Sequence, residues 1–237
     1  MVWPKPSGSR GVTQPRAVGS LEEVKPATTP VPAGFRPPQQ ARTRATLEKL
    51  LEAAEQILAE EGFDEFTMAA VADRSKTSVG AIYRRFDGKE QLVRAVKDRI
   101  LGRIEQEVSD ALAASADHDL TGVIAAFADA LASAFAPHCQ VIPDLLAVDD
   151  QAQRGVHAIA TLHRLFLDAL APHLGNIRRT DPMTAVALTS RTLIGACVHR
   201  ASVIRALPDG ISWQTWAEQM TDMATAYLLA PVSATHH

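Results

Sequence analysis

The sequence predicts an all-α fold, and three observations support this. Apolar residues recur at spacings of three and four along most of the chain, which is the period of a helix buried on one face. Hardly any stretch alternates apolar and polar residues as a half-buried strand would. Residues typical of helix ends, such as Gly62, Thr67 and the Asp181-Pro182 pair, stand where these stretches begin or stop.

Composition is that of an ordinary soluble globular protein. The chain has 237 residues, of which 46% are hydrophobic and 22% charged, enough for one large domain or two smaller ones. Two cysteines, Cys139 and Cys197, provide no disulfide framework and predict reduced thiols. Neither a signal-peptide core nor an apolar run approaching about 18 residues stands out. We therefore expect a cytoplasmic protein that does not enter a membrane.

The first 40 residues predict a disordered tail. They hold eight of the 14 prolines, carry five basic and two acidic residues, and show no apolar periodicity. Two roles stay open for this segment. It could be a solubilising extension, or a basic arm that adds loose contacts to DNA phosphates.

Order should begin near residue 41 with a helix that ends at Gly62 in a left-handed cap. Thr67 is suited to cap a second helix, and Ser78 a third, with a turn over 75–78 between them. A longer helix should start at 87–90, where Asp87 and Glu90 have the spacing of an acidic capping box. The apolar positions that predict these helices are Leu47, Leu50, Leu51, Ala54, Ile57, Leu58, Met68, Val71, Ala72, Ile82, Phe86, Leu92, Val93, Val96, Ile100 and Ile104.

Further helices with short breaks should fill the rest of the chain. Apolar stripes predict helical segments at 120–136, 141–148 and 154–171, with interruptions at Pro137 and near Pro172. Asp181 and Pro182 should start a helix that runs to Leu207. Ser212 should cap the last helix, which carries Trp213 and Trp216.

The segment 67–86 reads as two short helices around a tight turn, which is how a chain places a helix in the major groove of DNA. Between Arg74 and Arg103 the sequence has nine Lys or Arg residues against three Asp or Glu, although the whole chain carries a net charge of −3. Local positive charge of this kind favours contact with phosphates. Residues 104–237, with seven basic and fourteen acidic residues, are not expected to bind nucleic acid.

The segment from Arg44 to Arg103 resembles the DNA-binding domain of TetR-type transcriptional regulators. The turn departs from the family pattern: Ser75-Lys76-Thr77 stands where the family usually has Ala-Gly-Val. Without glycine, a left-handed residue there should cost about 1 kcal/mol. The residues that carry the resemblance are Gly62, Phe63, Thr67, Val71, Ala72, Ser78, Gly80, Ala81, Ile82, Tyr83, Phe86, Lys89, Glu90 and Leu92.

The resemblance and the chemistry of these side chains predict a set of DNA contacts. Small residues would let the third helix approach base edges, and a hydroxyl at its start could meet a phosphate. Arginines and lysines would contact phosphates or guanine. The predicted DNA-binding residues are Arg42, Arg44, Thr67, Lys76, Ser78, Val79, Gly80, Ala81, Tyr83, Arg84, Arg85 and Lys89. Tyr83 as a packing residue, and Arg84 and Arg85 as a solvated face, are the alternatives.

The resemblance also implies three parts: a tail over 1–40, a DNA-binding domain over 41–103 and a helical effector-binding and dimerisation domain over 104–237. The effector would be a small apolar or amphipathic molecule, and the last two helices would pair with those of a second copy. The dimer would then read a pseudo-palindromic operator. Members of this family are repressors more often than activators, so the resemblance implies a repressor. Candidate pocket residues, for each of which plain core is the favoured alternative, are Phe127, Phe135, Leu145, Leu162, Phe166 and Arg191.

Other classes of function find little support in the sequence. No nucleophile motif, phosphate-binding glycine loop or carboxylate pair indicates an enzyme. Cys197 and His199 are two residues apart and diverge on a helix, so no metal or other cofactor is expected. A helical adaptor that kept this fold but lost specific DNA binding is the alternative to a regulator.

Overall fold

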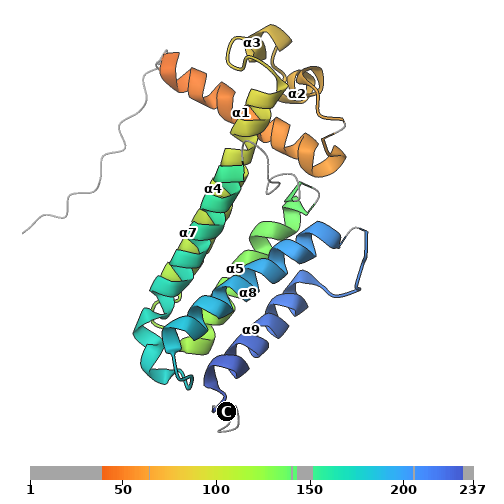
Figure 1. Cartoon of the computed structure of the whole chain (residues 1–237). Helices are drawn as coiled ribbons and strands as arrows, with labels where there is room; N and C mark the ends of the chain where they lie inside the picture. The colour runs from red at the N-terminus through yellow and green to blue at the C-terminus, as the bar shows by residue number, and fades with distance from the viewer. Residues whose placement is uncertain (1–38, 64, 140, 143–151, 205, 232–237) are drawn as a thin grey trace, which may run out of the picture. The chain divides into compact units, whose positions relative to one another are not determined.

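The computed structural model describes residues 39–63, 65–139, 141–142, 152–204 and 206–231, and within these ranges it is helical and contains no β-strand (Figure 1). The predicted all-α fold is thereby confirmed. The helices are α1 (Gln39–Glu61), α2 (Met68–Ser75), α3 (Val79–Tyr83), α4 (Lys89–Ala114), α5 (Leu120–Phe135), α7 (Ala152–Leu170), α8 (Pro182–Val203) and α9 (Trp213–Leu229), with short 3-10 helices η1 (Ala136–His138) and η2 (Ala171–Asn176). The predicted tail over 1–40 falls almost wholly outside the described residues.

Helix α1 ends at Gly62 and helices α2 and α3 begin after Thr67 and Ser78, as the sequence predicts, but α2 extends through Ser75 and α3 ends at Tyr83, so Phe86, which was expected within this helix, lies beyond it. Gly62, with φ of +81°, ends α1 in the left-handed conformation. The side chain of Thr67 accepts a hydrogen bond from the N–H of Ala70 at 3.1 Å, and that of Ser78 accepts one from Ala81 at 3.2 Å. Both are N-caps that satisfy otherwise unpaired donors of the first turn. Phe66 follows α1 and is fully buried against it.

The turn between α2 and α3 carries the strain that its sequence predicts. Lys76 is the C-cap of α2 and has φ of 54° and ψ of 39°; it is the one residue other than glycine with positive φ in the described ranges. An L-residue with a side chain pays a steric cost in this region. Its ammonium lies 3.6 Å from Asp73, but both side chains are exposed, so this ion pair contributes little.

A Lys76→Gly variant should therefore be more stable than the natural chain by roughly 0.5–1 kcal/mol, because glycine adopts positive φ without strain. Lys49, exposed in the middle of α1, provides the matched control. There the same substitution should cost about 1 kcal/mol, since glycine weakens a helix interior. Urea unfolding followed by circular dichroism measures both changes. Destabilisation by both variants would contradict this account of the turn.

Helix α4 starts differently from the prediction. Its N-cap is Gly88, which has no side chain to accept a hydrogen bond, so the predicted capping box of Asp87 and Glu90 is wrong. Instead the side chain of Gln91 accepts a hydrogen bond from the N–H of Asp87 at 2.5 Å. The amide of Gln91 satisfies a donor just before the helix, and the acidic side chains are not required.

Helix α4 runs without a break from Lys89 to Ala114, across the boundary that we predicted after residue 103. It packs against α1 at one end and against α5 and α7 further along. A continuous core follows the same path, with Leu92, Val96, Ile100 and Ile104 all buried. One continuous helix therefore joins the first three helices to those of the C-terminal half (Figure 1).

Helix α5 forms the centre of the C-terminal half, packed against α4 and α9. The stretch Leu120–His138 is, by length and composition alone, apolar enough to cross a membrane, with a mean hydropathy of 1.5 over its 19 residues. This contradicts the expectation that no apolar run approaches that length. Half of the stretch is buried inside the fold, and its apolar side chains belong to the core. Packing among helices accounts for the composition.

The last two helices are joined by a loop that a buried arginine holds in place. Helix α8 ends at Val203, four residues before the predicted end at Leu207. Arg200, 6% exposed, binds the Asp209 carboxylate, donates to the Ile211 carbonyl at 2.6 Å and lies 4.9 Å from the Trp213 ring centroid. These contacts tie the end of α8 to the start of α9. Ser212 caps α9 as predicted, accepting from Thr215.

Candidate nucleic-acid interface

Helix α3 separates a buried side from an exposed one. Ile82 in α3 and Phe86 just beyond it, 0% and 8% exposed, anchor the segment to the core. On the other side Val79 is 39% and Tyr83 is 53% exposed. An exposed Tyr83 side chain favours contact with a partner over packing within the chain, and its contact with DNA stays a prediction. The exposed side offers an aromatic and an aliphatic side chain to a partner molecule.

At Gly80 no side chain projects from this exposed side of α3. A Cβ added to Gly80 would find no atom within 4 Å, so the fold itself would accept a side chain there. Ser78 is exposed beside it, although its hydroxyl already caps α3, and Ala81 is half-buried. The absence of bulk at residue 80 therefore lets another surface come close to the helix backbone.

The predicted basic contacts divide into outward and inward groups. Arg44, Lys76 and Arg84 are exposed. Arg85 donates to the carbonyl of Thr43 at 3.1 Å, which ties the end of α3 to the start of α1. Lys89 donates to the carbonyl of Phe63 at 3.2 Å and lies 5.8 Å from the Phe66 ring centroid.

Arg85 and Lys89 therefore hold the motif together, and a DNA contact by either stays a prediction. The same is true of Thr67, which is exposed but caps α2. The side chain of Arg42 lies outside the described residues.

The positive charge counted in the sequence is partly neutralised inside the fold. Arg74 pairs with Glu60 and with Glu61, the latter at 2.7 Å, and holds α2 against the end of α1. Arg99 and Arg103 pair with carboxylates of α1. These three of the nine basic residues between 74 and 103 thus stabilise helix contacts, and the charge available to DNA is smaller than the count implies.

Residues 50–96 match the sequence profile of the bacterial regulatory proteins of the TetR family. The match begins inside α1 and ends inside α4, so it contains the whole helix-turn-helix with its exposed α3 face. Residues 50–96 of this chain therefore match the DNA-binding domain of TetR-family regulators. Comparison with curated proteins gave no match.

Solved structures agree in fold along most of the chain. A TetR-family regulatory protein from Rhodococcus RHA1 is 14% identical over 77% of this chain and 96% of its own, with a TM-score of 0.57. A transcriptional regulator from Cytophaga hutchinsonii is 15% identical over 78% and 97%, with a TM-score of 0.64. FadR from Bacillus subtilis, solved with stearoyl-CoA, is 13% identical over 76% and 98%, with a TM-score of 0.62. The C-terminal half, which lies outside the profile match, therefore shares its fold with these proteins.

The residues predicted to line an effector pocket are mostly core. Phe127 and Phe166 are fully buried, with ring centroids 4.5 Å apart between α5 and α7. Phe135 and Leu162 are also buried, whereas Arg191 is exposed on α8. Leu145 lies outside the described residues. A ligand contact by any of these side chains stays a prediction.

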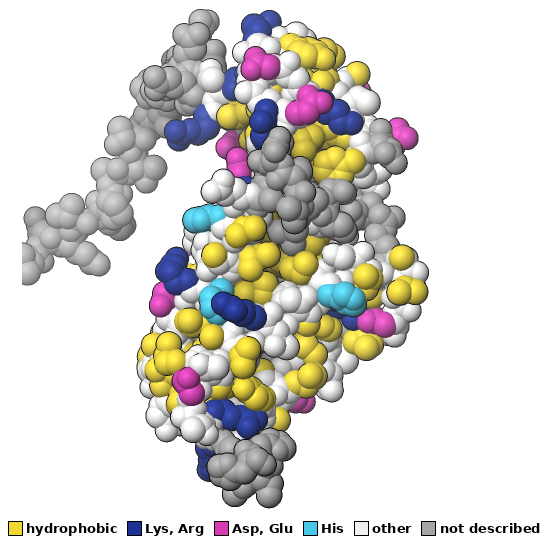
Figure 2. All heavy atoms as spheres, in the orientation of Figure 1, with side chains coloured by type: hydrophobic (Ala, Val, Ile, Leu, Met, Phe, Trp, Pro, Cys, Tyr) yellow, Lys and Arg dark blue, Asp and Glu magenta, His cyan; other side chains and the backbone are white. Residues whose placement is uncertain are grey.

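A hollow does occur between α8 and α9, and its lining is apolar. The groove measures about 370 Å³ and is open to solvent. Leu188 on α8 is 50% exposed and Met223 on α9 is 60% exposed. Figure 2 shows one face of the molecule, on which hydrophobic side chains, in yellow, are spread over the C-terminal half. We call this feature the α8–α9 groove; it is lined by Leu188, Thr189, Thr192, Leu193, Met220, Met223, Ala224 and Tyr227.

The two tryptophans of α9 do not belong to this surface. Trp216 is 7% exposed and Trp213 is half-buried, with ring centroids 5.7 Å apart. They pack within the chain. The exposed apolar side chains of α9 are Met223 and Tyr227, one turn apart on the groove side.

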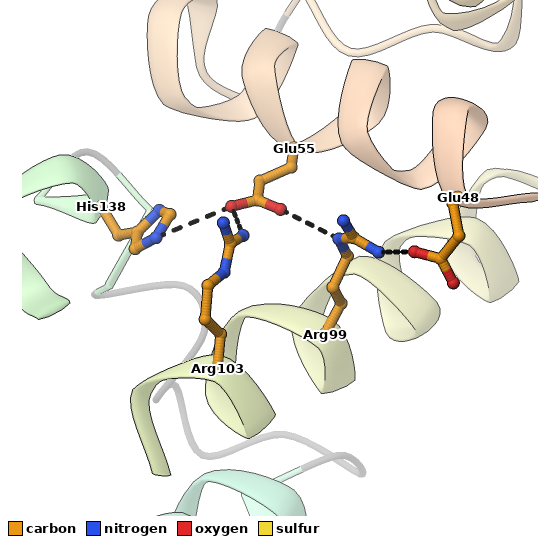
Figure 3. A network of polar contacts seen from close by, with 5 residues as sticks. All are labelled: Glu48, Glu55, Arg99, Arg103 and His138. Carbon is orange, nitrogen blue, oxygen red and sulfur yellow. Dashed lines mark hydrogen bonds and ion pairs between the residues drawn. The ribbon is translucent and has the colours of Figure 1, made fainter. Parts of the chain in front are cut away.

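A cluster of charged residues where α1, α4 and η1 meet was missed by the sequence reasoning. Glu55 lies on α1 and binds Arg99 and Arg103 of α4, with His138 of η1 nearby (Figure 3). The signal was present: Arg99 and Arg103 are four residues apart and so share a helix face. Among the residues the structure describes, no three His, Cys, Asp or Glu side chains gather as a metal site requires.

Proposed function

We propose that this protein is a sequence-specific DNA-binding transcriptional regulator of the TetR family, and that it represses until a small molecule releases it from its operator. The observation that carries the proposal is the exposed side of α3, where Val79, Gly80 and Tyr83 face outward while Ile82 anchors the helix. A helix held from behind with a low outer face suits entry into the major groove.

The α8–α9 groove supports a dimer. Exposed apolar patches on soluble proteins mark interaction sites. This groove is lined by residues of two long helices, α8 and α9, whose length suits the packing of helices from a second copy. A second copy would place its own α8 and α9 against the same surface, giving a two-fold interface in which both chains use the same residues. Two recognition helices related in this way would read a pseudo-palindromic operator.

Residues 41–103 would then be the DNA-binding domain, and 104–237 the effector-binding and dimerisation domain. Helix α4 belongs to both, so a shift of the C-terminal helices would move α4 and with it α3. An effector would act only if it bound one separation of the two recognition helices better than the other.

The effector we propose is apolar or amphipathic. The side chains inside the C-terminal half are almost all aliphatic or aromatic, which favours such a ligand over a highly charged one. FadR from Bacillus subtilis, similar in fold, binds stearoyl-CoA, a molecule of this amphipathic kind. A thermal-shift screen of long-chain acyl compounds against the purified protein would find effectors of this class.

Salt dependence of binding to duplex DNA tests the first step of the proposal. A regulator that neutralises phosphates should lose affinity steeply as salt rises, with log K falling by about 0.9 per contacted phosphate per unit of log salt. Fluorescence anisotropy with a labelled duplex gives this slope. An adaptor that has lost DNA binding would show neither the affinity nor the slope, and that result would end the proposal.

A further inference from the structure

Glu55 is a buried carboxylate that three helical segments share. Its side chain is 10% exposed, lies 3.3 Å from Nε of Arg99, pairs with Arg103 and lies 3.7 Å from Nε2 of His138 (Figure 3). A buried charge persists in a fold only when it is paired, and removing a partner is costly. The carboxylate of Glu55 therefore connects α1 to both α4 and η1.

His138 is the weakly bound member of this cluster. It is 7% exposed, and its Nδ1 atom is buried without a hydrogen-bond partner. A neutral imidazole has a single N–H, which can point towards Glu55. A protonated imidazole carries N–H on both nitrogens, so the second would be buried with no acceptor. Protonation is thus easier when η1 moves and exposes the ring.

The charges around His138 act in both directions. Glu52 and Glu55 line the hollow beside it from α1, and Arg99, Arg103 and Glu107 line it from α4. Cys139 follows His138 in the sequence, and its thiol donates hydrogen bonds to the carbonyls of Phe135 and Ala136. Burial lowers the pKa of His138, Glu55 raises it, and Arg103 lowers it further; the net direction is downward.

We propose that protonation of His138 releases η1 from Glu55, so that proton uptake at this junction is coupled to the arrangement of α1 and the DNA-reading helices. This inference rests on the proposed function. The closed contact is stable above the ordinary histidine pKa of 6.5 and loses stability as the pH falls below it, because the pKa of His138 in the closed state is lower. Operator binding selects one arrangement of the helices, so by reciprocity it must change the pKa of His138.

The test is an NMR titration of the His138 ring in the full-length protein, free and bound to its selected operator duplex, together with operator affinity measured across the same pH range. A shift of one pKa unit between the two states corresponds to about a tenfold change in affinity. We expect such a shift, and we expect H138Q to remove most of the pH dependence of affinity.

His163 is the matched control. It is half-buried in α7, its pKa is also lowered by burial, and its Nδ1 lies 3.0 Å from Ser190 of α8, within the C-terminal half. The H163Q variant should keep the pH dependence of the natural chain. Equal pH dependence in H138Q and the natural chain, or an unchanged His138 titration on operator binding, would overturn the inference.

A readout without DNA separates this inference from the proposed function. The unfolding free energy of the natural chain should fall more steeply below pH 6.5 than that of H138Q, whether or not any operator exists. Parallel curves would overturn the junction account, whereas absence of specific DNA binding would overturn only the regulator. If H138Q does not fold, E55Q gives the opposite test: loss of the carboxylate should lower the pKa of His138 further, so the unfolding free energy should keep falling to a lower pH than in the natural chain, and an unchanged pH range would overturn the junction account.

Discussion

Replacing Met223 by glutamate should turn the dimer into a monomer and abolish tight operator binding. Met223 is 60% exposed in the free chain and lies in the α8–α9 groove, so a dimer would bury it and would have to bury the introduced carboxylate too. A buried, unpaired charge costs far more than one apolar contact contributes. Leu188→Glu, on the opposite wall of the groove, should act in the same way.

The loss of operator affinity should be large because two linked recognition helices bind with an avidity that either alone lacks, by a factor of about 10² to 10⁴. Sedimentation velocity measures the mass, and anisotropy measures the affinity. Val156→Glu is the matched control, since Val156 is an equally exposed apolar residue on α7, outside the groove. A Met223→Glu variant that stays dimeric would refute the assignment of the groove as the interface.

Removing the Tyr83 or Arg84 side chain should weaken operator binding while leaving the fold intact. Both residues are exposed at the end of α3, so truncation to alanine creates no cavity in the core. A direct contact with a base or phosphate is worth roughly 1–3 kcal/mol, which corresponds to about a five- to hundredfold loss of affinity.

The two variants should differ in kind. Loss of a phosphate contact by Arg84→Ala would weaken binding to all sequences and reduce the salt slope by about one, whereas loss of a base contact would relax the sequence preference. Arg164→Ala is the control and should bind normally, since Arg164 is an exposed arginine on α7 that pairs with Asp168 four residues on. Full affinity in both α3 variants would contradict the placement of this face on DNA.

Features set by neighbours in sequence could be predicted well. The caps at Thr67, Ser78, Asp181 and Ser212 are all observed, because each depends only on a side chain and the N–H three residues later. The left-handed turn at Lys76 was foreseen from the family pattern for the same local reason.

Features that depend on contacts across the fold could not be predicted. Nothing local shows that Arg85 binds the Thr43 carbonyl 42 residues away, or that Lys89 binds Phe63. Hydrophobicity alone does not distinguish the buried Phe127 and Phe166, whose rings pack against each other, from Leu188 and Met223, which line a groove. Helical periodicity shows which face of a helix is apolar. Whether that face is covered by another helix or left open to a partner depends on how distant helices pack.

The most direct test of the central claim is selection of bound sequences from a random duplex pool by the purified full-length protein at physiological salt. We expect enrichment of a pseudo-palindrome whose half-sites lie on one face of the DNA, bound by two copies of the chain. Binding of random duplexes as strongly as any selected one, with no enriched motif, would contradict it.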